Sequence, residues 1–129
     1  MKLNHDLVRY VLLSIEECKE LTGPDEKKFL ASLKKYGTFE RDDVVYTVTK
    51  LHEADFITGK ITWASNVPMF IIPGNLTYEG HKFLDNIRDD GVWKDTKKVL
   101  SKFSSVSLSL VSNVAASVIT QLIKQELGI

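Results

Sequence analysis

The sequence predicts a mainly helical α+β fold, a winged helix-turn-helix domain that continues into a C-terminal helical extension. Three segments with apolar residues at helical spacing come first, and two short β-prone runs separated by a turn follow them. Three helices followed by a β-hairpin is the order of the winged helix, a relative of the helix-turn-helix. We expect a winged-helix-like domain over 1–103 and a C-terminal helix, used for packing or oligomerisation, over 104–129.

The first three helices are predicted from apolar periodicity and capping residues. The first runs from a cap at Asn4 or Asp6 to about residue 20. The second follows a cap at Asp25 and stops at the Tyr-Gly-Thr sequence of residues 36–38. The third covers 38–56, and its valines are poor helix formers, so tertiary packing must hold it.

The hairpin is predicted from two β-prone segments, 57–63 and 67–72, which flank the turn-prone residues 64–66. Gly59 is expected to form a bulge or bend in the first strand. This hairpin is the candidate wing.

Three helices are expected after the hairpin. A fourth helix follows the cap Thr77 and ends at residues 89–91, Asp-Asp-Gly. A basic helix over 93–103 comes next, and a long apolar helix covers about 106–127.

Composition restricts the possible functions. The 129 residues fit one domain, and 17 basic against 17 acidic residues give a net charge of zero, which argues against a strongly electrostatic nucleic-acid binder.

The sequence also indicates the cellular compartment. Cys18 is the single cysteine and the N-terminus has no apolar leader, so we expect a cytoplasmic protein. Residues 103–123 lack charge, but serines and other polar residues interrupt them, and we expect no membrane span.

Two stretches carry a resemblance to a known family. They are residues 44–57, with the pattern V-x-x-x-V-x-x-L-x-E-A-x-F-I, and residues 76–88, with the pattern L-T-x-x-G-H-x-F-L-D-x-I-R. The chain resembles a family of small phage and bacterial proteins of unknown function that are predicted to be winged-helix. The resemblance implies a prophage or bacterial setting, and it implies no activity.

We expect a non-enzymatic regulatory module that binds DNA with its third helix, helped by its wing and its basic fifth helix. The candidate DNA-binding residues are Arg41, Tyr46, Thr47, Thr49, Lys50, Lys60, Lys94, Lys97 and Lys98. Asp42 and Asp43 argue against DNA binding, because they lie at the N-terminal end of the third helix, the end that contacts base edges in helix-turn-helix docking. The alternative is a protein-binding adaptor or inhibitor without DNA binding, such as a phage factor that acts on a host protein.

No catalytic, cofactor or metal site is expected from the sequence. His81 and Asp85 share a helix face, but a metal site needs three or four ligands, so we interpret the pair as structural. Trp93 with Phe83 could stack on nucleic-acid bases, but large aromatic residues are more often core. Cys18 is expected to be a core residue of the first helix.

The last helix predicts a homodimer. An apolar stripe over residues 105–127 would exceed the exposed patch that monomers usually tolerate. The expected interface residues are Val111, Val114, Ala115, Val118 and Leu122.

Overall fold

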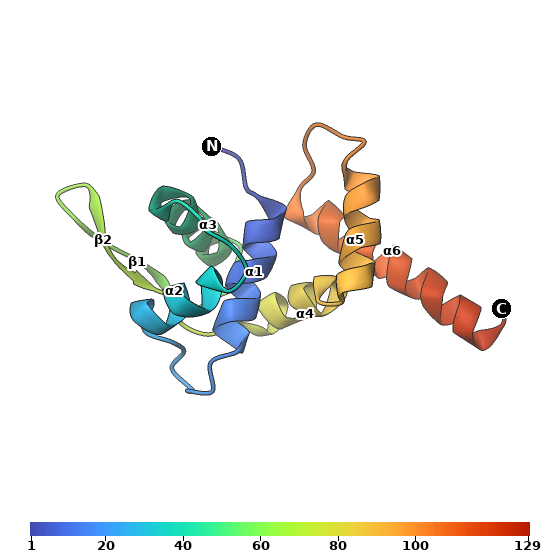
Figure 1. The fold of residues 1–129 in the computed structure, drawn as a ribbon, viewed down its shortest axis with the longest axis horizontal. Coiled ribbons are helices and arrows are strands. Elements are labelled where there is room, and N and C mark those ends of the chain that lie inside the picture. The colour runs from blue at the N-terminus through green and yellow to red at the C-terminus, as the bar shows by residue number, and fades with distance from the viewer. The chain divides into compact units, whose positions relative to one another are not determined.

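The computed structural model of the protein describes residues 1–129. The fold is α+β, with six helices and one two-stranded antiparallel sheet (Figure 1). The elements are α1 (His5–Glu16), α2 (Glu26–Lys34), α3 (Arg41–Glu53), β1 (Lys60–Ala64), β2 (Val67–Ile72), α4 (Tyr78–Ile87), α5 (Asp90–Leu100) and α6 (Leu108–Leu127). The chain divides into two compact units, residues 1–81 and 82–129, and each is described by itself.

The first unit is built on three helices that bury their apolar faces. Asn4 and Asp25 cap α1 and α2, because their side chains accept hydrogen bonds from the backbone of Leu7 and Lys28. The largest fully buried side chains of these helices are Leu7, Val8, Val11, Leu12, Ile15, Phe29, Val44 and Leu51. The hairpin extends from this three-helix cluster (Figure 1).

The turn of the hairpin lies at the residues where the sequence predicts it. Ser65 and Asn66 have φ angles of 51° and 64°, which is the pair of left-handed residues that a two-residue type I′ turn requires. The register pairs Ile61 with Ile71, and it shifts between Thr62 and Trp63. Of the two expectations for Gly59, a bulge or a bend in the first strand, the bulge is wrong, because the irregularity lies nearer the turn and Gly59 precedes β1.

Gly59 has another role, at the base of the hairpin. A Cβ atom there would lie 1.9 Å from the carbonyl oxygen of Ile72, so only glycine allows the two backbones to approach this closely. Ile57, expected to begin the first strand, instead forms an isolated bridge with Leu76 outside β1.

Two helices are shorter than their periodicity predicts. α1 ends at Glu16 instead of residue 20, because Ile15 is the last residue of its buried face. Cys18 lies beyond the helix and is half-buried, so its expected place in the core of the first helix is wrong. α3 begins at Arg41 instead of Thr38, after Glu40, which makes no side-chain capping bond.

In the second unit, the residues expected to end the fourth helix start the fifth instead. The Asp89 carboxylate accepts a hydrogen bond of 2.9 Å from the backbone N–H of Val92, so Asp89 is the N-cap of α5. α4 ends at Ile87. The Asp-Asp-Gly sequence of residues 89–91 is compatible with the end of one helix or the start of another, and here Asp89 caps α5.

α5 and α6 pack on each other within the second unit. The buried face of α5 consists of Val92, Trp93, Thr96 and Leu100. The Asn86 amide donates a hydrogen bond of 2.9 Å to the Ser112 hydroxyl, which ties α4 to α6. Both of these contacts lie within residues 82–129, the second compact unit.

Candidate interaction surfaces

The expected reading helix, α3, keeps four of its five candidate residues at least partly exposed. Thr47 is the exception, because it is 1% exposed and its hydroxyl donates a 2.7 Å hydrogen bond to the carbonyl oxygen of Asp43. Its expected contact with DNA is wrong. The spacing could have shown this, since Thr47 lies three residues after Val44 and four before Leu51, on the core face.

The two cations of α3 already have acidic partners. A guanidinium nitrogen of Arg41 lies 2.9 Å from the Glu26 carboxylate, and the Lys50 ammonium lies 2.8 Å from that of Glu53. The hydrogen bond and the charge of Glu53 raise the pKa of Lys50. The charge that α3 offers to a phosphate is therefore largely compensated.

The other two exposed candidates on α3 are engaged in local contacts. The Tyr46 hydroxyl donates to the carbonyl oxygen of Met1 over 3.3 Å, and the Thr49 hydroxyl donates to that of Val45 over 2.8 Å. Asp42 and Asp43 occupy the first turn of the helix, the end that contacts bases in helix-turn-helix docking. The helix as a whole presents little that attracts DNA.

The remaining candidate lysines are exposed on two different units. Lys60 begins β1 in the first unit. Lys94, Lys97 and Lys98 lie on α5 in the second unit, where the Lys97 ammonium is 5.8 Å from the centre of the Trp93 ring. Trp93 itself is 4% exposed, so it is a core residue and presents no open face for a base to stack on.

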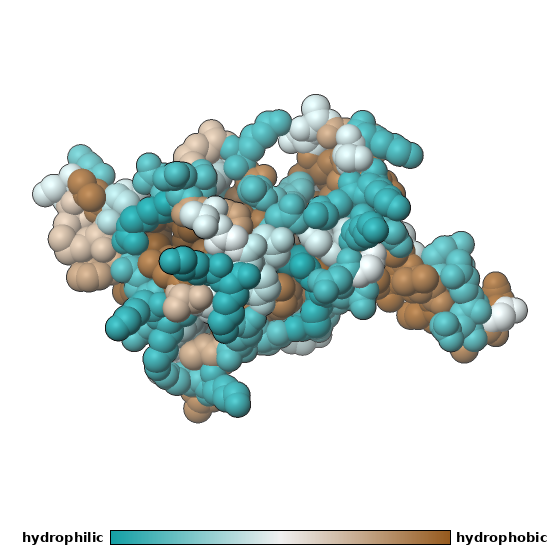
Figure 2. Space-filling view, viewed as in Figure 1, coloured by the Kyte–Doolittle hydropathy of each residue, from teal (hydrophilic) through white to brown (hydrophobic).

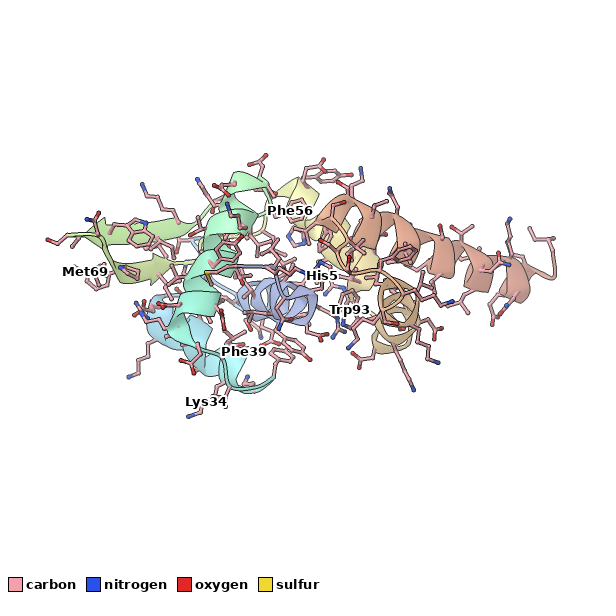
Figure 3. All side chains as sticks on the ribbon, turned by 90° about the horizontal axis from the view of Figure 1, so that it is seen from above. His5, Lys34, Phe39, Phe56, Met69 and Trp93 are labelled. Atoms are coloured by element: carbon pink, nitrogen blue, oxygen red, sulfur yellow. The ribbon has the colours of Figure 1, made fainter.

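The hairpin carries a surface that the sequence interpretation missed. Five large apolar side chains, each 47–60% exposed, lie on it, and we call them the hairpin patch: Trp63, Val67, Met69, Phe70 and Ile72. Figure 2 shows brown, hydrophobic surface over this part of the chain, and Figure 3 labels Met69 on the outer part of the hairpin.

The strand register explains why Phe70 and Ile72 of this patch stay outside. Ile61 and Ile71 are paired and buried, so the pairs on either side of them point to the other face of the sheet. These outer pairs are Thr62 with Phe70 and Lys60 with Ile72. An indication was available in the sequence, because residues 67–72 are all apolar, whereas a hairpin covered on one face should alternate.

The candidate dimer residues on α6 are divided between core and surface. Val111 and Ala115 are fully buried, so their expected place in an interface between chains is wrong. Val114 and Val118 are partly exposed, and Leu122 is exposed.

An open groove of about 440 Å³ lies along the second half of α6, and we call it the α6 groove. The residues that line it are Asp89, Val92, Ile119, Leu122, Ile123, Glu126 and Leu127.

No cluster of three or more histidine, cysteine, aspartate or glutamate side chains is placed to hold a metal ion. Nδ1 of His81 lies 3.7 Å from the Glu16 carboxylate, while Asp85 pairs with Arg88 at 3.0 Å. None of the helices has both the length and the apolar character needed to cross a bilayer.

Comparison with known proteins gives the chain's family. The sequence profile of the family described as "Hypothetical protein (DUF2513)" matches residues 2–107. The chain belongs to the DUF2513 family. An uncharacterised protein of Haemophilus influenzae is 34% identical over 127 residues, which cover 95% of this chain and 99% of that protein. No solved structure matches the chain significantly.

The L-T-x-x-G stretch of this DUF2513 protein has a structural role. The Thr77 hydroxyl donates to the carbonyl oxygen of Asp55 and accepts from the backbone N–H of Gly80, so it joins the end of α3 to the start of α4. A Cβ atom on Gly80 would lie 2.0 Å from the carbonyl oxygen of Phe56. These residues fix a helix junction and leave the exposed surfaces as the candidates for function.

Proposed function

We propose that this DUF2513 protein is a non-enzymatic interaction module of winged-helix type, in which the hairpin is the wing and docks on a protein partner. The hairpin patch is the observation that carries this proposal. Five large apolar side chains about half exposed within ten residues form the kind of surface that usually marks an interaction site. The order of three helices and a hairpin supports the winged-helix assignment.

The chemistry of the patch favours a protein partner over nucleic acid. Its five side chains carry no charge, and Lys60 is the only cation on the two strands. Phosphate neutralisation needs several cations, and those of α3 are paired with glutamates. An apolar surface on a bacterial host protein is the occupant that fits these side chains.

A photo-crosslinking experiment tests the proposal. A benzophenone side chain is placed at Phe70 of the full chain in a bacterial host, and a crosslinked partner is identified by mass spectrometry. The purified partner is then titrated with the wild-type protein and with Phe70→Ser. We expect Phe70→Ser to weaken binding at least about tenfold, as truncation of a central aromatic does at interfaces.

Tyr78→Ser is the matched control, because Tyr78 is an exposed aromatic residue outside the hairpin. It should leave the affinity unchanged. A partner that binds Phe70→Ser as tightly as the wild type would overturn the proposal, and so would the absence of any crosslinked protein.

DNA binding is the second candidate, and the exposed lysines of α5 favour it. Lys94 and Lys98 lie on one helix with Lys97, and Lys60 lies on the wing. A gel shift over a salt titration is the test, because binding driven by phosphate contacts is strongest at low salt. Lys94→Gln with Lys98→Gln should reduce the salt dependence, while Lys34→Gln on α2 should not. Absence of a shift at low salt removes this candidate.

A further inference from the structure

α6 is much longer than the helix on which it packs. It has 20 residues, whereas α5 has 11. Its fully buried residues, Val111 and Ala115, lie in its first half. The apolar face of the second half continues past α5 without cover within this unit, and Figure 2 shows brown surface along this part of the helix.

The α6 groove is where this face is open. Ile123 and Leu127 are exposed and Ile119 is half-buried, and they lie four residues apart along the helix. Residues at this spacing form a ridge on a helix surface, and such ridges pack into the grooves of a second helix. The shape and the apolar lining therefore suit an apolar helix.

We propose that residues 119–127 of α6 form an interface between two copies of this chain, paired antiparallel around a two-fold axis at Ile123. The segment is complementary to itself about that residue. In this arrangement Ile123 meets its own copy, and Ile119 lies opposite the partner's Leu127. Apolar side chains then face apolar side chains at all three positions of the ridge.

The charges of the segment allow this pairing. Glu126 lies opposite the partner's Thr120 and not opposite its own copy, so two like charges do not meet across the axis. Lys124 and Glu126 are the only charged residues of α6, and the whole chain has no net charge, so long-range repulsion between copies is small.

The size of the surface sets the expected strength of the dimer. Because the ridge is only one helix wide, the area that it buries on each copy is smaller than the roughly 800 Å² per partner of a standard stable interface. We therefore expect dissociation in the micromolar range, with dimer and monomer in exchange.

Sedimentation equilibrium of the full chain, from about 10 to about 500 µM, tests the proposal because dimer formation by mass action depends on concentration. The wild type should shift from monomer toward dimer over this range. Ile123→Lys brings two cations together on the axis and should leave a monomer that retains the helical circular dichroism of the wild type. Gln121→Lys, on the other side of the helix, is the matched control and should still dimerise.

Cysteine crosslinking tests the register directly. In a Cys18→Ser background, Ile123→Cys should form a disulfide-linked dimer under mild oxidation, and Gln121→Cys should not. A wild type that stays monomeric throughout, an Ile123→Lys variant that still dimerises, or equal crosslinking at both positions would each overturn the proposal. Phe70→Ser should keep the dimer, so this test and that of the hairpin patch give separate answers.

Discussion

Glu26 and Arg41, fifteen residues apart, hold the second hairpin strand against α2 and α3. One Glu26 oxygen accepts a hydrogen bond of 2.9 Å from the Arg41 guanidinium and one of 2.8 Å from the backbone N–H of Ile71. The same guanidinium nitrogen lies 3.3 Å from the carbonyl oxygen of Met69. The pair thus satisfies two backbone groups on the outer edge of β2, and this edge is partly protected from pairing with other strands.

We predict that Glu26→Ala lowers the free energy of unfolding by about 1–2 kcal/mol, because it leaves the Ile71 N–H without its acceptor and Arg41 without its carboxylate partner. Urea denaturation followed by circular dichroism measures this. Glu53→Gln removes an exposed ion pair and should change the free energy by less than about 0.5 kcal/mol. Equal losses in the two variants would contradict the role given to Glu26.

Gly80→Ala should be strongly destabilising, by more than about 2 kcal/mol, because the new Cβ would lie 2.0 Å from the Phe56 carbonyl oxygen and the helix junction would have to move. Gly91→Ala is the control. Gly91 is an exposed residue of α5 with only the Asp89 side chain nearby, at 3.2 Å, and alanine is the better helix former. Thermal unfolding of both variants is the measurement, and a Gly80→Ala midpoint at or above that of Gly91→Ala would refute this reasoning.

Asp55→Gly should stabilise the protein by about 1 kcal/mol. α3 ends in a Schellman motif, in which the backbone N–H of Phe56 donates to the Leu51 carbonyl and that of Asp55 donates to the His52 carbonyl. Asp55 has a φ angle of 62°, which glycine adopts without strain. Asp55→Ala should show no such gain. A urea midpoint for the glycine variant below that of the wild type would count against this account.

Glu17 should contribute to stability at neutral pH and lose that contribution in acid. Burial raises its pKa, but hydrogen bonds from the Ser32 and Tyr36 hydroxyls and the charge of Lys35 outweigh burial, and the pKa is lowered from 4.5. A depressed folded-state pKa gives stability that is present above the unfolded-state value and is lost as pH falls through the folded one.

The Glu17→Gln variant tests this pH dependence. Between pH 7 and pH 3 the wild type should lose more stability than the variant, with the difference developing below about pH 4.5. Urea midpoints at several pH values give the comparison. Parallel profiles for the two proteins would show that the contacts of Glu17 with Ser32 and Tyr36 contribute nothing.

Local chemistry in the sequence determined most of the element order. Asp25 and Thr77 accept hydrogen bonds from the backbone of the helices that they were predicted to cap. Ser65 and Asn66 form the expected hairpin turn. Capping and tight turns depend on residues within three or four positions of each other, so a short window of sequence is sufficient to predict them.

Tertiary structure decided the ends of helices and the exposed surfaces. α1 stops where its buried face stops, and Thr47 is buried because Val44 and Leu51 on either side of it face the core. Phe70 and Ile72 of the hairpin patch are exposed because Ile61 and Ile71, between their positions, occupy the buried face of the sheet. Each of these outcomes depends on which distant segment covers a side chain. Apolar burial is non-directional, so the local sequence does not predict which segment that will be.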